Sequence, residues 1–144
     1  MKPEETVDYN IKVCWHAISR MYNVQAAQND ITTSIGFVLL NIDPNEGTPA
    51  TKIAPLLGLE ARSLTRILKS MEEKGLIYKM ADEKDKRSVR IMLTEDGLKK
   101  KEISRQTVRK FNQKVREVIP QEDLDCFFKV ISQINGLIES KSIF

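Results

Sequence analysis

The 144-residue sequence predicts a mainly α-helical fold with one small β-hairpin. Over most of the chain, apolar residues recur every three or four positions, which is typical of amphipathic helices. Val89, Ile91 and Leu93 instead recur at every second position, which predicts a half-buried strand. The strand-forming residues 76–80 precede it, and the charged segment 82–87 separates the two. A hairpin among helices is therefore expected, in a chain whose length suits one domain.

Two helices are expected in the N-terminal third of the chain. The first covers about residues 5–28, and the second follows Thr32, whose hydroxyl can cap a helix N-terminus. The segment 43–47 is rich in turn-forming residues and ends the second helix.

A pair of short helices is expected at the centre of the chain. The apolar cluster 53–57 predicts the first, and Gly58 follows where a helix end favours positive φ. The second begins near Glu60 and has an apolar stripe formed by Leu64, Ile67, Leu68 and Met71. Two helices joined by a short turn and followed by a hairpin form a winged helix-turn-helix, expected over residues 48–97.

The free face of the second short helix is basic, as a DNA-reading helix requires. Arginine on such a helix can bind guanine through two hydrogen bonds in the major groove. The candidate DNA-contact residues on this face are Arg62, Ser63, Thr65, Arg66 and Lys69.

The hairpin, or wing, adds a second candidate contact. Lys86, Arg87 and Arg90 are its expected DNA-binding residues. Asp85 and Arg87 are two positions apart, so on an extended strand their side chains share a side. A charge-assisted pair would then orient the guanidinium for a narrow minor groove. The alternative is a tip of ordinary solvated charges.

These residues resemble the multiple-antibiotic-resistance regulator (MarR) family of bacterial repressors. The resemblance rests on Thr65 and Arg66, on residues 71–77 that close the reading helix, and on segments 85–87 and 93–97. It implies a dimeric DNA-binding repressor that uses the wing arginine in the minor groove. Pro55 departs from the family pattern, because a proline inside a helix removes an N–H and would start that helix late or kink it.

Both ends of the chain are helical and apolar on one face. A small domain rarely leaves so large an apolar face in water, so a homodimer is expected, and the resemblance implies the same. The protomer is then one domain, residues 1–144, with the winged motif flanked by dimerisation helices at about 5–28 and 98–140. Two-fold symmetry predicts a near-palindromic operator. The alternative is that the end helices pack within one chain. The expected dimer contacts are Ile11, Trp15, Ile18, Phe127, Phe128, Ile131 and Ile134.

Positive charge is concentrated after the hairpin. The net charge is +3, yet residues 98–116 hold eight lysines and arginines and one glutamate. Such a cluster is typical of a polyanion-binding surface. A solvated helix face is the alternative.

Catalysis has little support in the sequence. His16 is the only histidine, and no glycine-rich phosphate loop is present. We expect no enzyme activity, no metal and no cofactor. No apolar run approaches the roughly 20 residues of a membrane span, and the polar N-terminus predicts no signal peptide, so a cytoplasmic protein is expected.

Cys14 and Cys126 are expected to be reduced thiols. The resemblance implies a possible redox role for Cys14, because relatives that sense organic hydroperoxides keep a reactive cysteine in the first helix. Its position on the apolar stripe of that helix instead favours a buried, inert thiol, and Cys126 is interpreted in the same way.

The sequence therefore predicts a sequence-specific, double-stranded DNA-binding transcriptional regulator, a repressor released by a small aromatic or amphipathic molecule. The resemblance implies an effector pocket where the dimer helices meet the winged motif, with Trp15, Met21, Tyr22 and Phe37 as candidate lining. Packing alone explains these residues equally well. Two alternatives stay open: a cysteine-based oxidant-sensing repressor of the same fold, and a winged helix that binds protein and has no operator.

Overall fold

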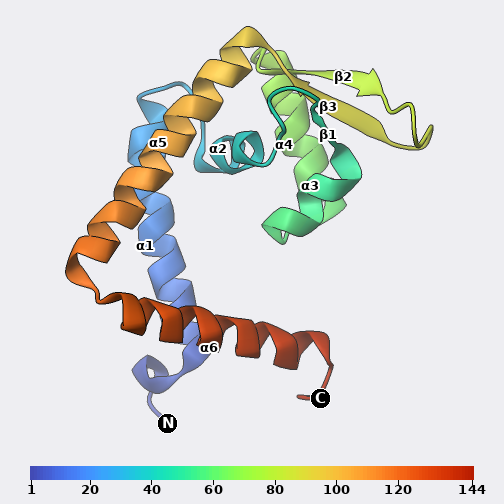
Figure 1. Ribbon diagram of the computed structural model, residues 1–144. Helices are drawn as coiled ribbons and strands as arrows, with labels where there is room; N and C mark the ends of the chain where they lie inside the picture. The colour runs from blue at the N-terminus through green and yellow to red at the C-terminus, as the bar shows by residue number, and fades with distance from the viewer. The chain divides into compact units, whose positions relative to one another are not determined.

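The computed structural model describes residues 1–144, and it confirms the mainly helical fold with a β-hairpin wing (Figure 1). Its elements, in chain order, are η1 (Pro3–Glu5), α1 (Val7–Ala27), α2 (Thr33–Leu40), β1 (Thr48–Pro49), α3 (Ala50–Leu57), α4 (Ala61–Glu73), β2 (Ile77–Ala81), β3 (Val89–Leu93), α5 (Glu95–Val118) and α6 (Gln121–Glu139). The chain divides into two compact units, Met1–Thr107 and Val108–Phe144. Strand β1 was not predicted from the sequence.

The core of the first unit is built around α2. This helix has little polar surface, and its Val38 and Leu39 are fully buried. Helices α3 and α4 pack against it, and the sheet contributes through β3. Removing this apolar surface from water is the main favourable term in folding. The largest buried side chains are Leu39, Ile42, Ile53, Met71 and Ile91.

Two predicted helix ends, at Thr32 and Gly58, are confirmed, and α5 has a similar cap. The backbone N–H of Ile35 donates to the Thr32 hydroxyl at 3.1 Å, which caps α2. The N–H of Gly97 donates to Thr94 Oγ1 at 3.0 Å, which caps α5. Gly58 ends α3 with φ of +63°, a conformation that glycine adopts without a steric penalty.

Pro55 lies inside α3 rather than at its start. The helix begins at Ala50, so the expectation of a late start is wrong. Beyond the proline the chain leaves the helix within three residues. There the N–H of Leu59 donates to the carbonyl of Ala54 at 2.9 Å, and Gly58 turns the backbone.

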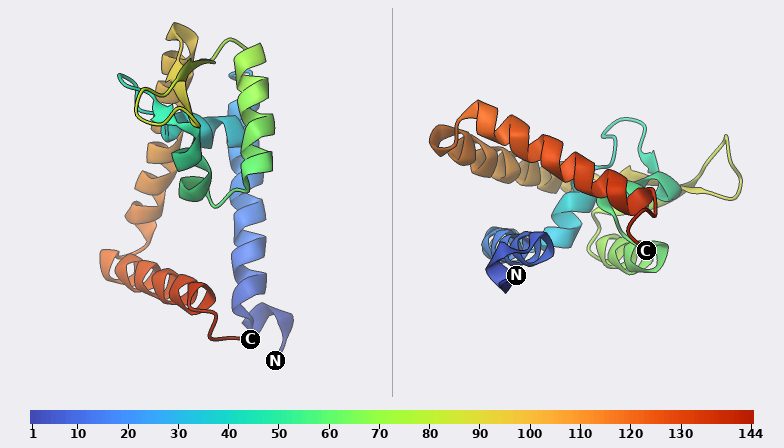
Figure 2. Two further views of the ribbon diagram at one scale, coloured as in Figure 1. Left: turned by 90° about the vertical axis from the view of Figure 1, so that its right-hand side faces the viewer. Right: turned by 90° about the horizontal axis from the view of Figure 1, so that it is seen from below.

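The three strands form an antiparallel sheet with the order β1-β3-β2. β2 and β3 pair along their whole length, from Ile77 opposite Leu93 to Ala81 opposite Val89. Ile91 and Leu93 are buried and the intervening Met92 is only partly buried, as the alternation predicts, while Val89 on the same face is 40% exposed beside the hairpin loop. The hairpin tip projects away from the helices of its unit (Figures 1 and 2).

The second unit comprises the end of α5, all of α6 and the C-terminal residues. α6 exposes several large apolar side chains, including Phe127 at 55% and Phe128 at 48% of their surface. The two phenyl rings contact each other edge to face, with centroids 5.7 Å apart. No helix in the protein combines the length and apolar character needed to cross a bilayer.

The predicted turn at 43–47 is organised by Asp43. Its carboxylate accepts hydrogen bonds from the N–H groups of Asn45 at 2.9 Å and Glu46 at 2.7 Å. These bonds stabilise the charged form and lower the pKa of Asp43 below its ordinary 3.8, Glu46 contributing most.

This lowered pKa predicts a pH-dependent contribution to stability. As the pH falls, the unfolded chain protonates first, so the contribution is present above about 3.8 and is lost as the pH drops to the lower folded-state value. Asn at position 43 keeps an acceptor oxygen but no charge. We therefore expect Asp43→Asn to lower the melting temperature at pH 7 and to differ less from the wild type at pH 3. Thermal unfolding followed by circular dichroism measures both. A difference that grows on acidification would contradict the assigned cause.

Candidate nucleic-acid interface

Helix α4 has one buried side and one exposed side. Leu64, Leu68 and Met71 lie in the core and are at most 5% exposed. The helical repeat of 100° per residue then directs the predicted contact residues outward. Of these, Ser63 is half-buried, and the exposed ones are Arg62, Thr65, Arg66 and Lys69.

The exposed cations of α4 have no partner within the protein. Arg62, Arg66 and Lys69 make neither a hydrogen bond nor an ion pair in the structure. Thr65 differs, because its hydroxyl donates to the carbonyl of Ala61 at 2.9 Å. The three cations are therefore free to bind an external acceptor, while the Thr65 hydroxyl can act toward an external group only as a hydrogen-bond acceptor.

The wing tip is a turn, which corrects the geometry expected from the sequence. Strand β3 begins at Val89, so Asp85 and Arg87 do not lie on an extended strand. The Asp85 carboxylate accepts the backbone N–H of Arg87 at 3.0 Å, and no ion pair joins the two side chains. Aspartate commonly stabilises turns through the N–H two residues ahead. The side chains of Lys86 and Arg87 are exposed and unpaired.

Near the tip end of the β2–β3 ladder, Arg90 makes contacts within the protein. Its Nη1 donates to the carbonyls of Glu46 at 3.1 Å and Gly47 at 3.2 Å. Its Nη2 lies 3.8 Å from a carboxylate oxygen of Asp82, a buried residue that also accepts the N–H of Lys84 at 3.0 Å. The predicted DNA contact of Arg90 therefore competes with this set of internal contacts.

Lys101 binds the C-terminal end of α2, a contact that the sequence did not reveal. Its Nζ donates to the carbonyls of Leu39 at 3.0 Å, Leu40 at 3.1 Å and Ile42 at 2.8 Å. The last carbonyls of a helix have no partner within it and carry partial negative charge, so an ammonium group suits them. Burial lowers the pKa of Lys101.

The expected basic surface after the hairpin is much reduced by internal contacts. Lys100 Nζ donates to the carbonyl of Asn29 at 2.6 Å. Other cations of segment 98–116 pair with acids on the same helix: Lys99 with Glu95, Arg105 with Glu102, and Lys114 with Glu117. Lys100 and Lys101 are thus neither a polyanion-binding surface nor a solvated face, and both interpretations fail there.

Comparison with known proteins identifies the family. The MarR family profile matches residues 31–89, from the start of α2 to the start of β3. The organic hydroperoxide resistance transcriptional regulator of Bacillus subtilis is 33% identical over 102 residues, which cover 71% of this chain and 69% of that protein. The transcriptional regulator SarZ of Staphylococcus aureus is 32% identical over 104 residues, 69% of this chain and 70% of SarZ. The chain belongs to the MarR family.

Solved structures of MarR-family type share the fold. The transcriptional regulator SlyA superposes with a TM-score of 0.80 at 21% identity, over 92% of this chain and 93% of that one. The S. aureus MepR–DNA complex gives 0.82 at 22% identity, over 91% and 97%. MarR-family proteins are DNA-binding transcriptional regulators and not enzymes. The predictions of a DNA-binding regulator without catalytic function are confirmed.

Three of the four residues predicted to line an effector pocket form an aromatic cluster. The ring of Phe37 on α2 lies 6.1 Å from that of Trp15 and 5.9 Å from that of Tyr22, both on α1. Tyr22 is buried, which raises its pKa, and Met21 is 38% exposed. The structure thus brings these residues together as packing between two helices of this MarR-family protein.

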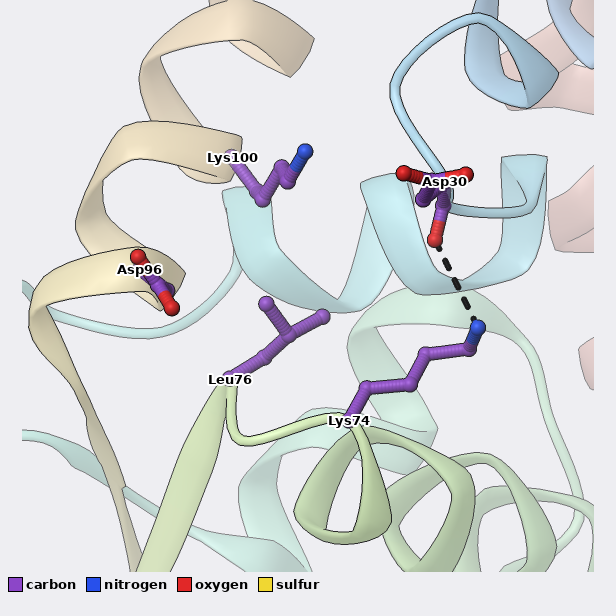
Figure 3. Close-up of a pocket in the computed structure, with 5 residues that line it drawn as sticks. All are labelled: Asp30, Lys74, Leu76, Asp96 and Lys100. Atoms are coloured by element: carbon purple, nitrogen blue, oxygen red, sulfur yellow. Dashed lines mark hydrogen bonds between the residues drawn. The ribbon is translucent and has the colours of Figure 1, made fainter.

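A cavity lies elsewhere, where the α1–α2 connection meets the C-terminal end of α4 and the first turns of α5 (Figure 3). Its volume is about 320 Å³, and Lys74 Nζ donates across it to the carbonyl of Asp30 at 3.5 Å. Two acids and two lysines balance its charge, and none of the predicted effector residues lines it. The lining residues are Asp30, Lys74, Leu76, Asp96 and Lys100.

Both cysteines are exposed free thiols, so the expectation that they are buried is wrong. The reason is that the apolar stripe of α1 is itself uncovered in the single chain, with Ile11 42% and Trp15 49% exposed. Cys14 makes no hydrogen bond in the structure, and the oxidant-sensing alternative is not favoured.

Proposed function

We propose that this MarR-family regulator is a repressor that binds a near-palindromic duplex as a homodimer and is released by a small aromatic or amphipathic molecule. The observation that carries the DNA-reading part is the exposed face of α4. Arg62, Arg66 and Lys69 are unpaired there, on a helix whose other side is fixed in the core. Free guanidinium and ammonium groups on a rigid helix suit base edges and phosphates of the major groove. A regulator that acts on DNA in this way would work in the cytoplasm.

The wing supplies the second contact of this proposal. Lys86 and Arg87 project from the exposed turn between β2 and β3. A narrow minor groove has enhanced negative potential and attracts an inserted arginine. The Asp85 turn would present Arg87 through the backbone, so Asp85 keeps its orienting role by a different route from the one first expected.

A second copy of the chain is the proposed occupant of the exposed apolar faces. α1 and α6 expose aromatic and aliphatic side chains beyond what isolated surface residues require. The proposed contacts stay those expected from the sequence: Ile11, Trp15, Ile18, Phe127, Phe128, Ile131 and Ile134.

Two structural neighbours support the repressor and effector parts of the proposal. CouR, at 23% identity, is a transcriptional repressor whose structure was solved with a 23-mer DNA duplex, and PcaV, at 17%, is a transcriptional regulator solved in complex with its natural ligand. An effector of this chain would need to favour a state that does not fit DNA, because only differential affinity shifts such an equilibrium.

Arg66 provides the test of DNA reading. Arg66→Ala should weaken operator binding more than random-duplex binding, by about 1–3 kcal/mol if the guanidinium reads a base. Arg66→Lys is the matched variant: it keeps the charge and loses the planar fork, so specificity should still fall. Binding titrations on both duplexes measure this. Equal losses on the two duplexes would indicate a phosphate contact, and absence of salt-dependent duplex binding by the wild type would favour a protein-binding module.

The dimer is tested at α6. Phe127→Lys should produce a monomer, because burying an unpaired ammonium group in an apolar interface is unfavourable. Leu56→Lys on α3, which also replaces an exposed apolar residue, should stay dimeric and serves as the control. Light scattering gives the mass of each. A wild-type monomer at micromolar concentration would contradict the homodimer and the palindromic operator together.

The wing tip is tested by a double-mutant cycle. Arg87→Ala should lower DNA affinity at least about ten-fold, roughly 1.4 kcal/mol, and reduce the salt dependence by about one ion. Folding should be unaffected, since the side chain is exposed and unpaired. Asp85→Ala should cost less and should add little in the Arg87→Ala background. Additive losses would show that the two residues act independently.

A further inference from the structure

We infer that Arg90 is a positioning residue for the wing: it fixes the β2–β3 hairpin against the turn that precedes β1, and thereby sets where Lys86 and Arg87 meet DNA. The DNA-dependent half of this inference rests on the proposed function. The structural half concerns the protein alone.

The guanidinium of Arg90 joins segments on both sides of its own strand. Nη1 donates to the carbonyls of Glu46 and Gly47, in the turn before β1. Nη2 pairs with Asp82, the residue that follows β2. Because β3 is the central strand of the order β1-β3-β2, one side chain joins the segments that flank β1 and β2, close to the tip end of the β2–β3 ladder.

The backbone alone holds β1 weakly. β1 contains two residues, and its partners in β3 are Ile91, opposite Thr48, and Arg90, opposite Pro49. Hydrogen-bonded and non-hydrogen-bonded pairs alternate along antiparallel strands, so only the Thr48–Ile91 pair can exchange both backbone hydrogen bonds. The two hydrogen bonds from Nη1 supply donors at the neighbouring carbonyls. Charge-assisted bonds of this kind are stronger than neutral ones.

Close approach of the turn makes this contact specific. A Cβ placed on Gly47 would lie 2.5 Å from the carbonyl oxygen of Ile91, so only glycine allows the turn to lie directly on β3. Gly47 also has φ of +70°. The turn that accepts the hydrogen bonds of Arg90 is therefore held close to β3.

Arg90 also pairs with the buried carboxylate of Asp82. The side chain of Asp82 is 6% exposed. Its carboxylate accepts a hydrogen bond from the N–H of Lys84 and forms an ion pair with Arg90. A buried carboxylate that loses its cation is strongly unfavourable. Asp82 begins the loop that carries the wing-tip cations, so this pair anchors the loop at its first residue. A guanidinium that turned toward a phosphate would leave Asp82 and two carbonyls without this partner.

The test uses Arg90→Lys in the full chain. Lysine keeps the charge, but a single ammonium group does not reproduce contacts on both sides of the strand. Amide hydrogen exchange without DNA should become about ten-fold faster in residues 82–88, because opening of the loop becomes easier. Operator affinity should fall about ten-fold with an unchanged salt dependence. In the Arg87→Ala background the same substitution should lower operator affinity by less than about two-fold. The arginine whose DNA contact depends on the position of the wing is then already absent.

Lys79→Met is the matched control. Lys79 lies on β2 opposite Ile91 and pairs at 4.0 Å with Glu72, so its loss removes a cation from the same sheet without touching the turn. Exchange in residues 82–88 should stay at the wild-type rate in this variant.

The contrary results are distinct. Wild-type exchange in Arg90→Lys would overturn the positioning role. So would an Arg90→Met variant with wild-type exchange whose salt dependence falls by about one ion, because that marks a phosphate contact. If Arg90→Lys fails to fold, Asp82→Asn provides a second variant, because it weakens one side of the same contact. It should accelerate amide exchange in residues 82–88, and exchange at the wild-type rate there would overturn the inference. Wild-type protein that binds no duplex would refute the proposed function, while the exchange comparison would still decide the structural half.

Discussion

Burial of the α4 stripe is the constraint on which DNA reading depends. Leu64, Leu68 and Met71 are almost completely buried against the core. Full burial of each such side chain contributes about 1.5–3 kcal/mol, so the three together are comparable with the roughly 5–15 kcal/mol that stabilises a whole domain. Rotating α4 about its axis would expose them and cost most of that stability. The outward direction of Arg62, Arg66 and Lys69 therefore follows from packing on the opposite side.

Features that depend on neighbours in sequence were predictable. The caps at Thr32 and Thr94, the glycine at position 58 and the two faces of α4 each follow from residues within one or two turns. The contacts of Lys101 and Arg90 did not follow, because their acceptors are backbone carbonyls about 60 and 44 positions away. A carbonyl is present at every residue, so no side chain marks it as an acceptor. Strand β1 was missed for a related reason: two residues show no alternation.

The same limit explains the wrong interpretation of the basic segment. A count of charges cannot tell which cations face solvent. Three carbonyls at the end of α2 surround the ammonium group of Lys101, and their hydrogen bonds offset its partial burial. Pairs such as Lys114 with Glu117 are exposed, and each contributes at most about 1 kcal/mol to stability. Exposed, unpaired cations are found on α4 and at the wing tip, where the net charge of the sequence segment is unremarkable, and in the basic segment itself only part of the charge, including Arg109 and Lys110, stays unpaired.

The segment between α2 and β1 connects these observations. Near its start the carbonyl of Ile42 accepts a hydrogen bond from Lys101 of α5, its middle is closed by the Asp43 carboxylate, and its last carbonyls, of Glu46 and Gly47, accept hydrogen bonds from Arg90. Few residues separate these three points. Lys101 and Arg90 donate to backbone carbonyls, and the Asp43 carboxylate accepts backbone N–H groups. The position of the wing is therefore tied to the first turns of α5 as well as to the core. In the proposed complex with DNA, Arg90 would in this way determine where Arg87 lies without itself contacting a base.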